Sequence, residues 1–360
     1  MNHLGRAFLA GILIVALGGC SSIGTGSISR DRFDYAGAIS DSWKSQMLMN
    51  LVKLRYSEPP VFLDVASVIS QYQVDSLVSL GFTWASPITS ALSNTQSVGG
   101  TVHYADRPTI TYNLLSGDKF ARSLMTPIPP AAIMSLIEAG WPAELVLRLT
   151  VQGINGIYNR SGAALRGRWA DPRFYQLIEA MGRVQRSGTV GIRVPPAKTK
   201  DVVPIMVFSR NVNETVEADR RLIRDILGLN AKEMEFTLAF GLVPQNDREI
   251  AILSRSMLDI LIELSGNIEV PEVHVDEKRT FPTREEDAFE GQKVQRLMRI
   301  LSQEKKPDDA FAAVHFHNYW YWIDDRDWIS KRIFSLIMFL FTLTEKPEKE
   351  GVPIITVPTG

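Results

Sequence analysis

The sequence has a single cysteine and no excess of either charge. Cys20 stands alone among 360 residues, so a disulfide within the chain and a metal site made only of cysteines are excluded. Basic residues number 39 and acidic residues 40, which gives a formal net charge of −1. Nucleic-acid binding depends on cationic side chains that neutralise phosphates, so we do not expect a nucleic-acid partner.

The common catalytic motifs are also missing. The chain has no Gly-x-Ser-x-Gly nucleophile elbow, no Walker lysine motif and no His-Glu-x-x-His zinc motif. Ser116 and Lys119 match the Ser-x-x-Lys pattern of penicillin-binding proteins and β-lactamases, and Ser265 with Asn267 resembles its companion motif. The Lys-Thr-Gly of that set is absent, and Ser116 as a helix N-cap explains the same residues. We therefore expect no cofactor and identify no catalytic residue.

The N-terminal segment has the composition of a secretory signal peptide. Arg6 carries the only charged side chain before Cys20, an apolar run follows from Ala7 to Val15, and small residues precede the cysteine. A basic start, an apolar run and a small-residue cleavage site together predict a signal peptide over residues 1–19. The apolar run is too short to cross a bilayer, which takes about 20 residues in a helix.

The end of this segment, Leu17-Gly18-Gly19-Cys20, resembles the lipobox of bacterial lipoproteins. The resemblance implies cleavage before Cys20 and attachment of acyl chains such as palmitate, which makes the membrane a partner of the chain. Two or more acyl chains anchor a protein stably. Ser21, rather than aspartate, at the next position is similar to the pattern that enteric-type bacteria export to the outer membrane. The resemblance thus implies an outer-membrane lipoprotein whose body faces the periplasm.

The remaining chain mixes strands and helices without strict β-α-β alternation, which predicts an α+β fold of one large domain or two closely packed subdomains. We expect a lipidated tether over 20–36, an N-terminal part over 37–200 and a C-terminal part over 201–360. Periodicity and turn residues predict helices over 38–56, 118–125, 130–139, 172–186, 214–227, 248–264 and 327–343. They predict a hairpin over 101–115 and strands over 189–194, 203–209, 235–240 and 312–323.

The predicted strand over 312–323 carries the candidate binding surface. Alternate residues of a strand share a face, which groups His315, His317, Tyr319 and Tyr321 on one side. Rings with polar tips recur at binding sites, so this face is a possible site for an envelope protein partner. The alternatives are packing under a neighbouring helix and a metal site at the two histidines. We expect no metal, because the pattern is that of an ordinary amphipathic strand.

An apolar run of 11 residues, Ile333–Leu343, lies near the C-terminus. Its length is about half of a membrane span. A fully buried core helix is the favoured interpretation, and a helix that docks on a partner or on the membrane surface is the alternative.

The anchor and the missing catalytic motifs together indicate the class of function. Segments Pro108–Tyr112 and Trp320–Asp325 are similar to pieces of uncharacterised bacterial lipoproteins, a resemblance that implies no activity. We therefore expect a structural or interaction component of the cell envelope rather than an enzyme. The alternative is an envelope hydrolase whose site is assembled from residues distant in sequence.

Replacement of Cys20 by alanine tests the lipobox. We expect Cys20→Ala to abolish both lipidation and cleavage by the lipoprotein signal peptidase, because the thiol is the group that is acylated. Metabolic labelling of cells with a palmitate analogue measures the outcome. Equal labelling of the variant and the wild type would contradict the prediction.

Overall fold

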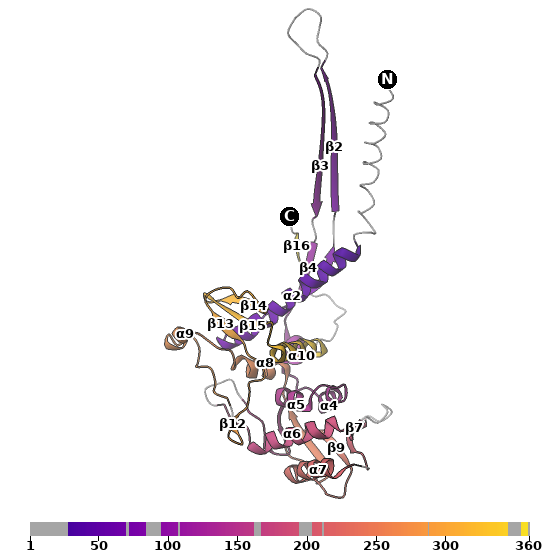
Figure 1. Cartoon of the computed structure of the whole chain (residues 1–360), viewed down its shortest axis with the longest axis vertical. Coiled ribbons are helices and arrows are strands. Elements are labelled where there is room, and N and C mark those ends of the chain that lie inside the picture. The colour runs from indigo at the N-terminus through magenta and orange to yellow at the C-terminus, as the bar shows by residue number, and fades with distance from the viewer. Residues whose placement is uncertain are drawn as a thin grey trace, which may run out of the picture. The chain divides into compact units, whose positions relative to one another are not determined.

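The computed structural model describes residues 28–69, 72–83, 95–106, 109–161, 167–193, 204–210, 212–286, 288–344 and 354–358 (Figure 1). Cys20 and the predicted signal peptide lie outside these residues. The chain divides into two compact units. Unit 1 comprises Met1–Pro60 and Gly117–Pro347, and unit 2 comprises Val61–Ser116 and Glu348–Gly360.

Unit 1 contains a six-stranded sheet in the order β6-β5-β10-β9-β8-β7. Its strands are β5 (Val151–Ile154), β6 (Ile157–Tyr158), β7 (Val190–Arg193), β8 (Ile205–Phe208), β9 (Glu235–Phe240) and β10 (Glu249–Ser254). β9 and β10 are parallel, whereas the other neighbours are antiparallel. A boundary at residue 200 would separate the hydrogen-bonded neighbours β7 and β8. The predicted division into 37–200 and 201–360 is therefore not the one that the structure has.

Four helices pack with this sheet and with one another. They are α4 (Pro130–Glu138), α5 (Ala143–Thr150), α6 (Pro172–Arg186) and α7 (Glu214–Leu227). α4 contacts β7 and β9, α5 contacts β5, and α6 contacts β6 and α7. The caps of α7 follow from the sequence: the Asn213 side chain accepts from the Val216 N–H at 2.9 Å, and Gly228 ends the helix at a φ of 66°.

Helix α2 (Ile28–Arg55) begins ten residues earlier than the sequence predicted. Residues 28–36, which were predicted to belong to the tether, are helical. In the C-terminal half, Met47, Leu48, Leu51 and Val52 recur at helical spacing and are completely or almost completely buried. The helix ends before Pro59, as predicted, because the residue preceding a proline is disfavoured in the helical region.

The predicted helix over 248–264 is wrong in its first half. Residues Glu249–Ser254 form β10, and only Met257–Ser265 form a helix, α8. The helix starts at Ser256, whose hydroxyl accepts from the Asp259 N–H at 3.1 Å while the Asp259 carboxylate accepts from the Ser256 N–H at 3.0 Å. This reciprocal cap stops the helix from extending towards β10.

The predicted strand over 312–323 is wrong as well, because the segment is a hairpin. β14 (Ala310–Phe316) and β15 (Tyr319–Asp324) are antiparallel, and β13 (Leu301–Gln303) pairs with the other edge of β15. His317 and Asn318 form the turn with φ values of 46° and 66°. Positive φ at both central residues is the backbone of a two-residue hairpin turn, for which Asn-Gly is the usual sequence.

Three short elements and the last helix complete the main body of unit 1. They are α3 (Asp118–Met125), α9 (Glu272–Asp276), the β11–β12 hairpin (Ala288–Phe289 and Gln292–Lys293) and α10 (Trp328–Thr344). Within the described residues, no helix combines the length and the apolar character needed to cross a membrane.

Unit 2 is made of strands. β1 (Phe62–Ile69), β4 (Thr109–Leu115) and β16 (Ile354–Pro358) form an antiparallel sheet in the order β1-β4-β16. β2 (Tyr72–Thr83) and β3 (Thr95–Asp106) form a separate two-stranded ribbon, the long pair of arrows in Figure 1. The predicted hairpin over 101–115 is therefore wrong in its pairing, since β3 pairs with β2 and β4 with β1 and β16. The mixture of helices and sheets confirms the α+β class.

Helix α10, which contains the apolar run, is buried on one side. Its buried side chains are Ile333, Phe334, Leu336, Ile337, Leu340 and Phe341. Phe339, in contrast, is 48% exposed, whereas the adjacent Leu340 is 2% exposed. The helix thus packs in the core through one face, whereas the favoured interpretation of the sequence was a fully buried helix.

These two neighbours give a matched test of the packing of α10. Leu340→Ala should lower the free energy of unfolding by about 2–5 kcal/mol, because it leaves a cavity in the core. Phe339→Ala should cost less than about 1 kcal/mol, because substitutions of exposed side chains have small effects. Urea denaturation of the two variants measures the difference. Similar losses for both would show that Phe339 is also packed.

Candidate functional site

The four residues of the predicted binding face do not share a face. The register of the hairpin places Tyr321 opposite Val314, Tyr319 opposite Phe316, and His315 opposite Trp320. Cross-strand partners lie on the same side of a sheet, so the two tyrosines lie on the opposite side from His315. The chain reverses through two residues, which exchanges odd and even positions between the strands. His315 is exposed, His317 lies in the turn, and Tyr321 is completely buried.

Tyr321 belongs to a buried polar network that the sequence did not predict. The Tyr56 hydroxyl lies 2.5 Å from the Tyr321 hydroxyl and 2.6 Å from Nδ1 of His274. Tyr56 follows the end of α2, and His274 lies on α9, where the sequence predicted no helix. Nε2 of His317 lies 3.6 Å from a carboxylate oxygen of Glu58 at the edge of this network. Tyr56 and His274 are 218 residues apart in the sequence, so no local sequence pattern links them.

Burial keeps the two tyrosines and His274 of this network neutral. It raises the pKa of Tyr321 and of Tyr56, so both hydroxyls keep their protons. Burial, with Arg279 and His317 nearby, lowers the pKa of His274 and favours the neutral ring. Burial also lowers the pKa of Arg55 to about 10, and its guanidinium donates to the Phe281 carbonyl at 2.6 Å. We interpret the network as a stabilising link between α2, α9 and the hairpin.

The lowered pKa of His274 predicts a pH dependence of stability. A histidine whose pKa is lower in the folded state binds fewer protons there than in the unfolded chain. Stability is then complete above the ordinary pKa of about 6.5 and is lost as the pH falls towards the folded-state pKa, by up to about 1.4 kcal/mol per pH unit. Urea denaturation of the wild type above and below that pH measures the loss.

His274→Asn is the test variant, because it keeps an acceptor near Nδ1 without a titrating ring. We expect His274→Asn to flatten the pH dependence of the free energy of unfolding. His315→Gln, on the exposed side of the hairpin, should leave that dependence unchanged. Equal slopes for the wild type and His274→Asn would show that this ring does not couple folding to protons.

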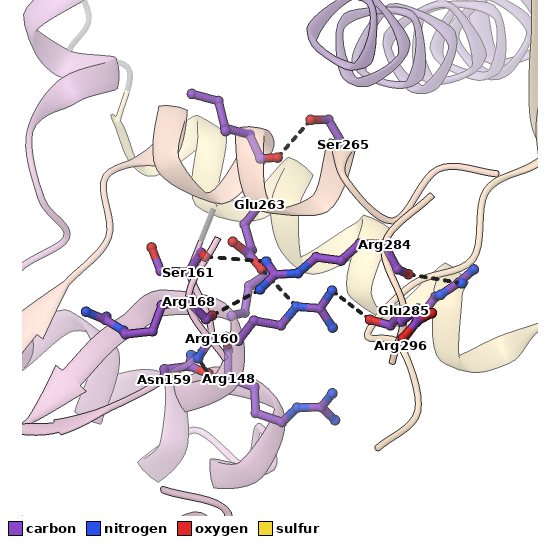
Figure 2. Close-up of polar contacts among 12 residues, drawn as sticks. Arg148, Asn159, Arg160, Ser161, Arg168, Glu263, Ser265, Arg284, Glu285 and Arg296 are labelled. Atoms are coloured by element: carbon purple, nitrogen blue, oxygen red, sulfur yellow. Dashed lines mark hydrogen bonds and ion pairs between the residues drawn. The ribbon is translucent and has the colours of Figure 1, made fainter. Parts of the chain in front are cut away.

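A second cluster, rich in arginine, surrounds a small hollow of about 30 Å³ in unit 1. Four arginines line it, from the last turn of α5, from the segment after β6, from the β10–α8 junction and from the segment after β12. The lining residues are Arg148, Asn159, Arg160, Tyr175, Arg255, Glu263, Asn267, Val294, Gln295, Arg296 and Leu297. Figure 2 shows Arg148, Arg160 and Arg296, from three of these segments, near the helix that carries Glu263. We call this site the arginine pocket.

Arg255 is the buried base of the arginine pocket. Nη1 donates to the carbonyls of Arg148 and Leu149 at 2.8 and 3.0 Å, and Nη2 donates to the carbonyl of Arg160. These bonds fasten the end of α5 and the segment after β6 to the β10–α8 junction. Burial lowers the pKa of Arg255, with Arg160 and Arg168 acting in the same direction and Glu263 opposing them.

The other arginines also donate to backbone carbonyls of neighbouring loops. Arg148 donates to Gln295 at 2.7 Å, Arg160 to Glu285 at 3.1 Å and Arg296 to Arg284 at 3.3 Å. Farther along the same wall, Arg284 donates to the carbonyl of Arg168 at 3.0 Å (Figure 2). A carbonyl satisfies an N–H donor but carries no net charge. These bonds orient the guanidinium groups around the hollow.

Carboxylates offset part of this charge. Arg160 lies 3.7 Å from Glu263, and Arg296 lies 3.3 Å from Glu269. Glu263 is the only carboxylate among the described residues that line the pocket, against four arginines. The arrangement suits a phosphate or carboxylate group, because guanidinium groups bind such oxyanions through paired N–H donors.

The structure also shows the surroundings of the serine motifs and of the metal-site alternative that the sequence raised. Gly117, rather than Ser116, is the N-cap of α3, without a side-chain cap. The Ser265 hydroxyl donates to the Ile262 carbonyl at 2.7 Å, which is an ordinary bond within α8. Within the described part of the chain, no three histidine, cysteine or acidic side chains are grouped as a metal site would need. Cys20, the predicted lipidation site, lies outside it.

The chain matches no protein-family model, no curated protein and no solved structure. No relative therefore supplies a function or a set of site residues for comparison. The function has to be argued from the sequence and from the geometry of the arginine pocket.

Proposed function

We propose that this chain is a lipid-anchored protein of the cell envelope whose body binds an anionic group in the arginine pocket. It acts as a binding or scaffold component. The lipobox-like residues ending at Cys20 support the anchor, and Ser21 supports an outer membrane location with the body facing the periplasm. An envelope protein or a small metabolite would present the same chemistry to the pocket, a phosphate or a carboxylate.

The observation that carries the proposal is the excess of arginine around a hollow. Hydrogen bonds to charged groups contribute about 1.5–3 kcal/mol each, more than bonds between neutral groups. The bonds to backbone carbonyls hold the guanidinium groups in place before a ligand arrives, which reduces the entropy lost on binding.

The lining also favours binding over hydrolysis. Among the described residues of the pocket wall there is no serine, threonine, cysteine or histidine. Hydrolases that use a serine, threonine or cysteine nucleophile activated by a histidine need such groups. The arginine pocket therefore supports the binding class over a hydrolase of that kind.

Two substitutions that change the charge of the pocket in opposite directions test the proposed binding. Arg148→Gln removes a positive charge and should weaken binding of inorganic phosphate or succinate by about 10- to 100-fold, the loss of one charge-assisted bond. Glu263→Gln removes the opposing negative charge and should tighten binding. Isothermal titration calorimetry of the full chain at low ionic strength measures both affinities.

Arg186→Gln is the control, since Arg186 is an arginine with a 63% exposed side chain outside the pocket. It should leave the affinity unchanged. Because general damage to the fold would weaken binding in both pocket variants, a tightening by Glu263→Gln separates charge from damage. Failure of the wild type to bind either anion, or weakening by both pocket variants, would overturn the proposal.

A further inference from the structure

Register and alternation divide the positions of the β2–β3 ribbon into a mainly apolar set and a mainly polar set. Its register pairs even-numbered positions with even and odd with odd, from Tyr72 with Asp106 to Thr83 with Thr95. Alternate positions of a strand belong to the same face. The even-numbered positions between the terminal pairs are Val74, Ser76, Val78, Leu80, Phe82, Gln96, Val98, Gly100, Val102 and Tyr104. The odd-numbered ones are Gln73, Asp75, Leu77, Ser79, Gly81, Ser97, Gly99, Thr101, His103 and Ala105.

A ribbon of this kind is poorly suited to water. Two isolated strands are marginally stable there, and each outer edge presents a row of backbone donors and acceptors. Each strand has 12 residues, so the ribbon is about 40 Å long at about 3.3 Å per residue. At a tilt of about 45° this length spans about 28 Å, close to the hydrocarbon core of a bilayer.

The residue types along the apolar face also fit a bilayer. Between Val74 and Phe82, and between Val98 and Tyr104, the even-numbered positions hold no charged residue. Aromatic residues stand near both ends of the face, Tyr72 and Tyr104 at one end and Phe82 at the other. Apolar faces bounded by aromatic residues at both ends are typical of strands that cross membranes.

We propose that the β2–β3 ribbon inserts into a lipid bilayer with its even-numbered face towards the acyl chains. In lipid every backbone polar group must be paired, so the two open edges of the ribbon pair with the edges of the same ribbon in further copies of the chain. This insertion depends only on the ribbon and not on the arginine pocket. It adds a second membrane contact to the anchor proposed at Cys20.

Protease protection tests the insertion. The full chain is reconstituted into vesicles of phosphatidylethanolamine and phosphatidylglycerol and treated with proteinase K, and surviving fragments are identified by mass spectrometry. We expect a fragment that contains residues 72–106 to survive with vesicles and to be degraded without them. Retention of the chain by an acyl anchor alone would leave the ribbon open to digestion, so the readout separates the two contacts.

Val78→Arg and Ser79→Arg form a matched pair for the face. They are neighbours at the middle of β2, and each lies opposite a glycine, Gly100 and Gly99. Arginine near the bilayer midplane is strongly unfavourable on a lipid-facing surface, so Val78→Arg should reduce the protected fraction at least roughly tenfold. Ser79→Arg should retain most of the protection. Chemical cross-linking in vesicles should also give oligomers of the wild type that Val78→Arg does not form.

Three outcomes would overturn the proposal. The wild-type ribbon could be digested equally with and without vesicles, an outcome that the wild type alone would establish. The two arginine variants could lose protection to the same extent. Protection could occur in cell envelopes but not in vesicles, which would mean that a protein rather than lipid covers the face.

Discussion

The buried guanidinium group of Arg255 is the constraint on which the arginine pocket depends. Burial of a charge without partners is costly, so the carbonyls of Arg148, Leu149 and Arg160 must stay where its N–H groups can reach them. That requirement fixes the end of α5 and the segment after β6 against the β10–α8 junction. The same group that holds these segments together contributes positive charge to the hollow between them.

Local patterns predicted those elements whose boundaries are set by neighbouring residues. Helices α3, α4, α6 and α7 begin and end within a residue or two of the predicted positions, and prolines or capping side chains mark the starts of α4, α6 and α7 directly. The apolar run in α10 also predicted a core helix, although only packing against the rest of the unit could show that Phe339 is excluded from the core.

The hairpin of β14 and β15 shows where such patterns fail. Alternation over residues 312–323 is compatible with one long strand and with two short ones, and the choice depends on recognising the turn. His317 and Asn318 adopt positive φ without a glycine, so the usual turn residues are missing. The error changes more than the number of strands. A two-residue reversal exchanges the faces, which places Tyr321 in the core instead of beside His315.

The arginine pocket had no pattern in the sequence. Its arginines come from positions between 148 and 296, and in a chain with 39 basic and 40 acidic residues none of them stands out. Net charge averages over the whole surface, whereas affinity for an anion depends on the charges within a few ångströms of it. The near-zero net charge, which argued against a nucleic-acid partner, therefore gave no information about a local cationic site.

The two buried polar clusters of unit 1 respond to burial in opposite ways. The hydroxyls of Tyr56 and Tyr321 and the ring of His274 become more firmly neutral, since burial raises the pKa of the tyrosines and lowers that of the histidine. The two hydroxyls and the histidine ring satisfy one another by hydrogen bonds. Arginine resists neutralisation because its pKa starts above 12, and even the buried Arg55 falls only to about 10. Charge in the arginine pocket is therefore balanced by neighbouring carboxylates or by an anion from outside, which is why we place the binding site there and not in the tyrosine network.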